Sequence, residues 1–306
     1  MKISIVVPVY NSEGSLRELY TRITKTLQSI TPNYEIIMVD DDSYDNSWPI
    51  LLKLRADDKK VKIIQLMKNF GQHNALMCGF HYSSGDYIIT MDDDLQHPPE
   101  EIPKLISVIA RKKYDVVYGQ YLKKEHNFIR NFGTSFINLI LKKVTQRHIN
   151  ITSFRVINRL VVKKIIKHSN YNVMIDVCIS NLVANQKVGL CQINHHKRKY
   201  GRTNYSFRRL ISFGVGLILN YSTLPLKIAS MTGLFLSLLS FISAIVLLIN
   251  YFHHQTHISG WTSLTLSVIF FSGIILFVLG VIGEYISRIF LSLNNKPQFE
   301  IREVKI

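Results

Sequence analysis

Cysteine is scarce in this chain of 306 residues, which contains only Cys78, Cys178 and Cys191. The three lack the paired spacing of a zinc site and are too few for a disulfide framework. This usage excludes a disulfide scaffold and fits a reducing cytosol. The apolar start ISIVVPVY is short and has no small-residue cleavage site, so we expect a buried strand there and not a signal peptide.

Acidic side chains are scarce in the second part of the chain. Residues 102–306 hold 27 basic and 6 acidic side chains, whereas residues 1–101 hold 10 basic and 15 acidic ones. The acidic first part indicates a cation site. The basic second part predicts contact with polyanions such as phosphates, nucleic acid or an anionic membrane surface.

Charge is almost absent from two long apolar runs. Residues 226–252 carry only Lys227, and residues 261–282 carry no charge. Because about 20 apolar helical residues cross a bilayer, we predict transmembrane helices over 226–252 and 261–287, which nucleic-acid binding would not explain. The loop 253–260 has no Lys or Arg while both flanks are basic, so we expect an extracytoplasmic loop and two cytoplasmic termini.

Strands and helices alternate over about the first 120 residues. The strand-like segments are KISIVVPVY, YEIIMVD, VKIIQLM, DYIITMD and YDVVYGQ, and helical periodicity separates them. This alternation predicts an α/β domain with a mostly parallel sheet, which we assign to residues 1–200. We expect residues 201–225, in which basic and apolar side chains alternate, to lie in the membrane interface, and residues 288–306 to form a cytoplasmic tail.

Polar clusters follow the first four of these strands: YNSEG, DDDSYDNS, KNFGQHN and DDDLQHPP. Ligands of parallel sheets bind beyond the carboxyl ends of the strands, so we place the site there. The run Asp92–Asp94 alone is typical of a solvated turn, but its position among the other clusters favours a divalent cation site. Mg²⁺ is usually held by one or two carboxylates with substrate phosphates and water. Asp92 and Asp94 are two residues apart, so they would share one face of an extended strand, and Pro98 and Pro99 predict a turn soon after them.

These motifs, together with HKRKYGRTNYSF and GEYISRIF, resemble glycosyltransferase family 2, in its polyisoprenyl-phosphate glycosyltransferase group. The resemblance covers nearly the whole chain. FGQHNALMCGF, DLQHPPEEIP and the pair His195-His196 are most similar to the undecaprenyl-phosphate aminoarabinose transferase branch. The resemblance implies a GT-A fold and an enzyme that uses a nucleotide-sugar.

The resemblance also implies roles for residues near the donor nucleotide. Asp41 and the loop Pro8–Glu13, which includes Tyr10, would contact the nucleotide. Gly71 is either a glycine at a helix start or a point where the backbone approaches the nucleotide.

The metal and phosphate contacts implied by the resemblance come from other segments. Asp92, Asp94 and Gln96 would hold Mg²⁺ or Mn²⁺, and Asp92 and its neighbour Asp93 would contact the substrate. Basic contacts to the phosphates of donor and acceptor would come from Arg130, Arg155, Arg198 and Arg202. Of these, Arg130 and Arg155 would act with Asp94 as the catalytic residues.

Three positions depart from the family pattern. Ser12 stands where many members have an acidic residue, so Glu13 is a candidate substitute. Asp42 replaces the glycine common in DDGS, and Thr203-Asn204 replaces the usual Ser-Lys. These departures bear on sugar and acceptor preference more than on the reaction class.

Other polar residues have simpler explanations. Asp40, Asp42 and Asp45 are typical of turns and helix caps. His73, His195 and His196 lack metal spacing, and we expect them to be satisfied by hydrogen bonds.

The predicted activity is transfer of a sugar, with inversion, from a UDP-sugar to undecaprenyl phosphate at the bacterial inner membrane. A homo-oligomer, such as a tetramer packed through the membrane helices, fits the small residues Gly273, Gly280 and Gly283. A polysaccharide synthase is an alternative, although the QxxRW signature is missing and two spans are few for a polymer channel. A non-catalytic membrane scaffold is another, against which the intact Asp92, Asp94 and Gln96 argue.

Overall fold

The computed structural model describes residues 1–121, 152–167, 173–194, 260–293 and 297–306, with a few scattered residues between 226 and 245. The chain divides into two compact units. One unit combines Met1–Leu210 with Lys296–Ile306, and the other is Ile211–Asn295. Each unit is described by itself below.

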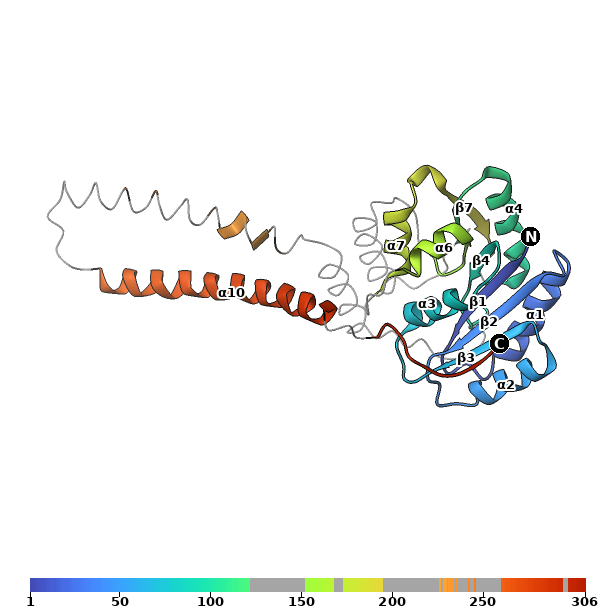
Figure 1. Ribbon diagram of the computed structural model, residues 1–306. Helices are drawn as coiled ribbons and strands as arrows, with labels where there is room; N and C mark the ends of the chain where they lie inside the picture. The colour runs from blue at the N-terminus through green and yellow to red at the C-terminus, as the bar shows by residue number, and fades with distance from the viewer. Residues whose placement is uncertain are drawn as a thin grey trace. The chain divides into compact units, whose positions relative to one another are not determined.

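The first unit is built on an eight-stranded sheet with the order β7-β5-β6-β4-β1-β2-β3-β8 (Figure 1). Parallel pairs join β1 to β2, β1 to β4, β2 to β3 and β5 to β7, and antiparallel pairs join β3 to β8, β4 to β6 and β5 to β6. The strands are β1 (Ile3–Val9), β2 (Tyr34–Asp40), β3 (Val61–Leu66), β4 (Tyr87–Thr90), β5 (Val116–Tyr121), β6 (Arg155–Asn158), β7 (Val188–Ile193) and β8 (Ile301–Lys305).

The central strands are apolar along nearly their whole length because both faces of the sheet are covered. Every residue of β1 and of β2 is buried. Side chains alternate between the faces, so Ile3 and Ile5 enter one core cluster while Val6 enters the other.

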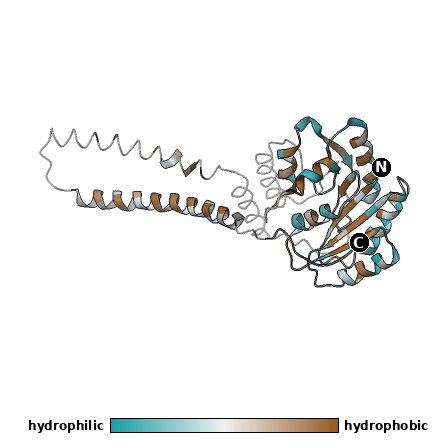
Figure 2. Ribbon diagram, in the orientation of Figure 1, coloured by the Kyte–Doolittle hydropathy of each residue, from teal (hydrophilic) through white to brown (hydrophobic). Residues whose placement is uncertain are grey.

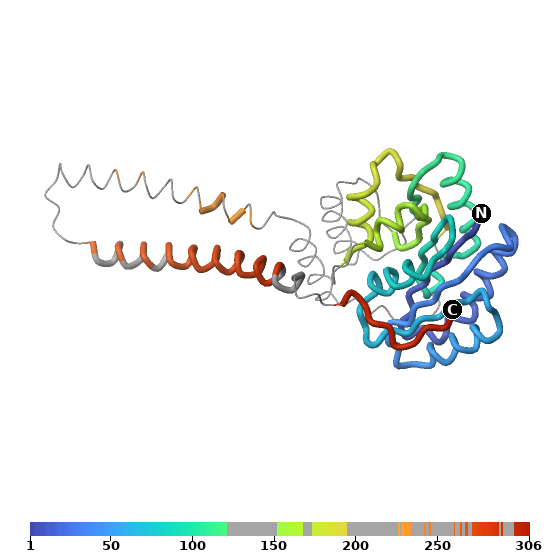
Figure 3. Tube along the Cα trace, viewed as in Figure 1, coloured from blue at the N-terminus to red at the C-terminus, as the bar shows by residue number. Residues whose placement is uncertain are grey.

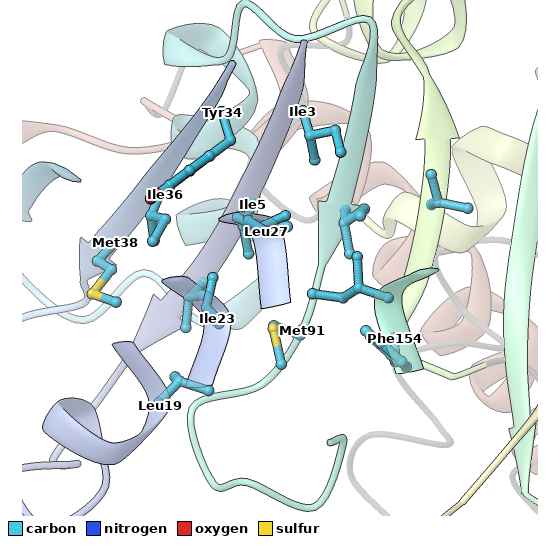
Figure 4. Packing of buried hydrophobic residues seen from close by; sticks show 14 of the residues in the cluster. Ile3, Ile5, Leu19, Ile23, Leu27, Tyr34, Ile36, Met38, Met91 and Phe154 are labelled. Atoms are coloured by element: carbon cyan, nitrogen blue, oxygen red, sulfur yellow. The ribbon is translucent and has the colours of Figure 1, made fainter. Parts of the chain in front are cut away.

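Helices pack on both faces of this sheet. On one face lie α1 (Leu16–Gln28), α2 (Ser47–Asp57) and α4 (Ile102–Lys112), and on the other α3 (Gln72–Tyr82), α6 (Arg159–Ile165) and α7 (Ile175–Leu182). Two short 3₁₀ helices span Pro99–Glu101 and Asn185–Lys187. Figure 4 shows how Leu19, Ile23 and Leu27 of α1 lie over the strand residues of the first core cluster.

The predicted α/β fold with a mostly parallel sheet is confirmed, with two differences. The last four residues of the segment TSFRVIN form β6, which is inserted antiparallel between β4 and β5. The predicted tail contains β8, which runs antiparallel to β3 at the sheet edge (Figure 3).

The second unit contains α10 (Trp261–Leu293), a helix of 33 residues. Most of α10 has the colour of hydrophobic residues in Figure 2, and apolar side chains such as Leu264, Leu276 and Phe277 are about two-thirds exposed in this chain. Counting only what the structure describes, no helix is both long and apolar enough to cross a membrane. The predicted interfacial segment 201–225 lies outside the described residues.

Candidate active site

The candidate site lies at the carboxyl ends of four parallel strands, where the loops after β1, β2, β3 and β4 meet. Hydrogen bonds join these loops in pairs. The Tyr10 N–H donates to Asp93 (3.2 Å), and the Gly71 N–H donates to Asp41 (2.8 Å). The structure therefore brings together the loops that the sequence placed at one edge of the sheet.

The three consecutive aspartates lie on a turn, as the prolines predicted. β4 ends at Thr90, and Leu95 has a φ of 61°, a left-handed conformation that reverses the chain. The Gln96 N–H donates to Asp94 Oδ1 (3.1 Å), and the Asp94 side chain is buried. The turn thus lets each aspartate have different neighbours.

Asp92 accepts one hydrogen bond on each carboxylate oxygen. Gln72 Nε2 donates to Oδ1 (2.6 Å) from the first turn of α3, and Ser153 Oγ donates to Oδ2 (2.6 Å) from the segment before β6. These bonds orient the carboxylate, and each oxygen keeps a second lone pair.

Asp93 supports the loop after β1. Besides the Tyr10 N–H, it accepts a hydrogen bond of 2.5 Å from the Ser12 hydroxyl. Burial raises the pKa of Asp93 to about 7, although these two hydrogen bonds oppose the shift. Ser12, one of the departures from the family pattern, therefore serves as a hydrogen-bond donor to Asp93. The prediction that Asp93 contacts substrate stays a prediction.

Glu13 and Asp45 accept hydrogen bonds from residues at the start of α2. Glu13 Oε2 accepts from the backbone N–H and the side-chain amide of Asn46 (3.0 and 2.9 Å). Asp45 accepts from the backbone N–H groups of Glu13 and Ser47 (3.0 and 2.9 Å). Asp45 acts in the way expected of a helix-start aspartate. A nucleotide contact of Glu13 stays a prediction.

Asp41 is buried and joins the loop after β2 to the start of α3. Its two oxygens accept from the N–H groups of Phe70 (2.7 Å) and Gly71 (2.8 Å). Burial raises the pKa of Asp41 to about 6, against the lowering effect of these two bonds.

Gly71 caps α3 with a φ of 89°, which L side chains rarely adopt, and nothing lies within 4 Å of where a Cβ would stand. The backbone conformation is thus a sufficient reason for glycine, and an approach to nucleotide remains open.

Arg155 lies beneath the site in a buried polar cluster. Its side chain is 1% exposed and its guanidinium forms an ion pair with Asp176 of α7. The Tyr118 hydroxyl donates to the same Asp176 oxygen (3.1 Å). Burial would lower the pKa of Arg155, but the negative charge of Asp176 raises it overall. A phosphate contact of Arg155 stays a prediction, because in this structure its observed partner is a carboxylate.

Two histidines, His73 of α3 and His97 of the loop after β4, lie close to acidic side chains of this region. His97 is buried, lies 5.3 Å from the Phe154 ring centroid to centroid, and has its Nδ1 4.0 Å from Asp92 Oδ2. Burial lowers the pKa of both His97 and His73. Both side chains are therefore favoured in the neutral form.

Reasoning from the sequence overlooked several members of this arrangement, namely Gln72, His97, Ser153, Tyr118 and Asp176. Asp176 had a signal, because it is one of six acidic residues after position 101. Ser153 stands two residues before Arg155, the residue of this segment to which the resemblance gives a role.

Of the other predicted residues, Pro8 and Tyr10 are described by the structure and the remaining ones are not. Pro8 lies buried in β1 opposite Val39, and the Tyr10 ring meets that of Tyr44 edge to face at 6.1 Å. Arg130, Arg198 and Arg202 lie outside the described residues, as do His195, His196 and Thr203-Asn204. Within the described ranges, no three His, Cys, Asp or Glu side chains are arranged to hold a metal by themselves.

Comparisons with known proteins agree with this fold. The profile of Glycosyl transferase family 2 matches residues 4–166, and that of the GtrB C-terminal hairpin matches residues 224–289. The chain therefore belongs to glycosyl transferase family 2, and it is a glycosyltransferase.

One full-length relative and several solved structures are similar to this chain. The chain is 32% identical to the undecaprenyl-phosphate 4-deoxy-4-formamido-L-arabinose transferase of Proteus mirabilis (strain HI4320), over 99% of this chain and 94% of the relative. Glucosyl-3-phosphoglycerate synthase from Mycobacterium tuberculosis, in a crystal structure with Mn²⁺, UDP and glucosyl-3-phosphoglycerate, matches with a TM-score of 0.54 and 16% identity. That match covers 71% of this chain and 77% of the other. A complex of the same enzyme with Mn²⁺ and UDP-glucose matches equally well, at 15% identity and a TM-score of 0.54. At these identities the structural likeness shows the fold alone.

Proposed function

We propose that the protein transfers a sugar from a UDP-sugar to a polyisoprenyl phosphate, undecaprenyl phosphate, with inversion at the anomeric carbon. The observation that carries the proposal is that the Asp41–Gly71 bond and the Asp92–Asp94 turn lie together at the strand ends, in a chain of this family. Gln72, next to Gly71, joins the two through its bond to Asp92 Oδ1 (2.6 Å). The similarity to an undecaprenyl-phosphate sugar transferase over nearly the full length supports the acceptor.

The donor nucleotide would bind along the loops after β1 and β2. Asp41 has its carboxylate oriented by the N–H groups of Phe70 and Gly71, and each oxygen keeps capacity for a further hydrogen bond. The Tyr10 side chain is 39% exposed at the same edge and offers an aromatic surface to a base.

Asp92, Asp94 and Gln96 would hold Mg²⁺ or Mn²⁺ together with the donor diphosphate. Two carboxylates and one amide oxygen suit a hard cation, which usually takes only one or two carboxylates when substrate phosphates complete its coordination. A bound metal ion would supply Lewis-acid stabilisation of the departing nucleoside diphosphate.

The chain has little proton transfer to perform. A phosphate monoester is already an anion near neutral pH because its second pKa is about 6, so the attacking oxygen needs no strong base. The residues instead have to orient two anionic substrates and offset their repulsion. The 27 basic residues after position 101 are the source of that positive charge, with Arg130, Arg198 and Arg202 as the predicted contacts.

The acceptor's lipid chain requires a membrane location, and we propose two spans at the bacterial inner membrane with both termini cytoplasmic. The run 226–252 has one charge and 261–282 has none, and the hairpin profile covers both. The exposed apolar side chains of α10 are suited to lipid contact. Assembly into a homo-oligomer through these helices stays a prediction, for which crosslinking in membranes is the measurement.

The experiment is transfer of radiolabelled sugar from several UDP-sugars to undecaprenyl phosphate in the presence and absence of Mg²⁺ or Mn²⁺. Wild type should transfer from one donor and only with metal. Asp94→Ala should lose about 100-fold or more of this activity, because a metal ligand is removed.

Asp86→Ala is the matched control, since Asp86 lies just before β4 at the other end of the strand and bonds to the Lys2 N–H (2.8 Å). Its transfer rate should stay within about twofold of wild type. Metal-independent transfer, or an unchanged rate in Asp94→Ala, would contradict the metal assignment. No transfer from any donor by folded protein in lipid would overturn the proposed function.

A further inference from the structure

The loop after β2 contains a residue in an unfavourable backbone conformation. Asp42 has a φ of 61°, in the left-handed region that favours glycine. Its position is the one where the family motif commonly has glycine. Aspartate at this point therefore needs support from its surroundings.

That support comes from the C-terminal strand, far away in the sequence. Arg302 of β8 has Nη1 3.5 Å from Asp42 Oδ1, and its Nη2 donates to the Met67 carbonyl (2.8 Å). The Met67 N–H in turn donates to the Glu300 carbonyl (2.9 Å). One guanidinium thus connects the loop after β2 with the end of β3.

Asp41 joins the same two loops from within the protein, through the N–H groups of Phe70 and Gly71. Arg302 and Asp41 are therefore two successive connections between residues 41–42 and residues 67–71. Any movement of Asp42 displaces its neighbour Asp41, since the two share a peptide bond.

We infer that Arg302 is a positioning residue for the donor nucleotide, which acts by holding Asp42 and Met67 and so fixing the Asp41 carboxylate. This inference rests on the proposed function of Asp41 in nucleotide binding. Arg302 itself does not touch the reacting atoms. The C-terminal strand thereby has a part in donor affinity.

The Arg302–Asp42 ion pair is partly exposed to solvent, which weakens its electrostatic attraction. The position of Arg302 in β8 compensates for this. The Arg302 and Asp42 side chains are 49% and 37% exposed, and isolated surface pairs of this kind contribute little. Here Arg302 lies at a register shift of β8, between Ile301 and Glu303, which pair with Leu66 and Gln65 of β3, and the guanidinium has a second, neutral acceptor in the Met67 carbonyl. Less conformational entropy is therefore lost when the contact forms.

The kinetic test compares Arg302→Ala, Arg302→Lys, Asp42→Gly and the double variant Arg302→Ala/Asp42→Gly in the full chain in lipid. Arg302→Ala should raise the donor KM about tenfold and change kcat by less than about twofold, and Arg302→Lys should lie between. Glycine adopts the Asp42 conformation without support. Adding Arg302→Ala to Asp42→Gly should therefore raise KM by less than about threefold.

Lys305→Ala is the matched control, because Lys305 lies on the same strand and pairs with Glu303 (3.1 Å) away from the loop. It should leave the donor KM unchanged. Equal KM values for Arg302→Ala and wild type would overturn the inference. An Arg302→Ala effect that is equally large in the wild-type and the Asp42→Gly backgrounds would overturn the route through Asp42.

A second measurement does not depend on activity. Hydrogen exchange of the amides of Phe70 and Gly71 should be faster in Arg302→Ala than in wild type or Lys305→Ala, because Asp41 holds these amides. If wild type transfers no sugar, the proposed function fails and faster exchange still supports the positioning role. Unchanged exchange at both amides contradicts it.

Discussion

Glu35, at the start of β2, shows what a single buried carboxylate contributes to this fold. It lies near the amino end of β2, whereas the candidate site lies at the carboxyl ends of the strands. It accepts hydrogen bonds from the Ser4 hydroxyl (2.6 Å) and the Ser84 N–H (2.6 Å). Lys62 and Lys2 place their ammonium groups 3.0 and 3.2 Å from it. Burial would raise the pKa of Glu35, but these partners lower it to about 2.

Glu35→Gln should therefore destabilise the domain in a pH-dependent way. Because the folded-state pKa is depressed from 4.5, the stabilisation is complete above about pH 4.5 and is lost as the pH falls toward 2. The shift corresponds to roughly 3 kcal/mol at neutral pH. Urea unfolding of the full chain in detergent, followed by Trp48 fluorescence with Trp261 replaced by Phe, measures this loss.

Glu18→Gln is the control for that measurement. Glu18 pairs with Arg22 at 3.5 Å on the partly exposed surface of α1, so its loss should cost about 0.5 kcal/mol or less. A loss for Glu35→Gln that is as large at pH 2 as at pH 7 would refute the electrostatic explanation.

At the site, the sequence predicted the positions of the residues that follow strand ends, and their roles stay predictions. Asp41, Gly71 and Asp92–Asp94 were placed together because the carboxyl ends of parallel strands share an edge. The bond from Ser12 to Asp93 and the ion pair of Arg155 with Asp176 were not predictable. Each joins side chains from loops or elements whose meeting depends on the complete packing.

At the scale of elements, α3 packs closely on β1 and β2 through Gly79. A Cβ on this residue would stand 2.3 Å from Val6 Cγ1 and 3.4 Å from Val39 Cγ2. The absence of a side chain therefore sets how near the helix lies to the sheet.

Gly79→Ala should lower the free energy of unfolding by about 1–2 kcal/mol. Alanine gains about 1 kcal/mol in helix propensity, but the overpacking costs up to about 3 kcal/mol. Urea unfolding measures the change. In a Val6→Ala background, which lacks the clashing methyl group, Gly79→Ala should be neutral or stabilising. Equal destabilisation in both backgrounds would show that packing against Val6 is not the cause.

Elements with a clear pattern of apolar residues could be predicted from the sequence. Strands whose position depends on pairing with distant strands could not. The strands up to β5 are apolar runs bounded by turns, and they were located correctly. β6 is only four residues long, and its place between β4 and β5 depends on antiparallel pairing over long sequence distances. IREVK of β8 has few apolar residues because it lies at an edge, and it was predicted to be a tail.

At the scale of the whole molecule, the sheet domain is discontinuous in sequence. Its last strand, β8, follows the segment Ile211–Asn295, which forms a separate unit. Phe299 and Ile301 pack against the second core cluster, and Arg55 Nη2 donates to the Ile306 carbonyl (2.6 Å). The N-terminal part therefore has an unpaired edge at β3 until the C-terminus has been made.

Deletion of residues 297–306 should consequently destabilise the domain and promote self-association through the free β3 edge. Loss of the β8 hydrogen bonds and of the Phe299 contact should cost about 2–4 kcal/mol, and an exposed edge strand pairs readily with another chain. Thermal unfolding and sedimentation in detergent measure the two effects. A synthetic peptide with the sequence PQFEIREVKI, added in excess, should restore both by occupying the edge, whereas a scrambled peptide of the same composition should not. A deletion variant as stable and as dispersed as wild type would mean that the C-terminal strand closes an edge that the domain can leave open.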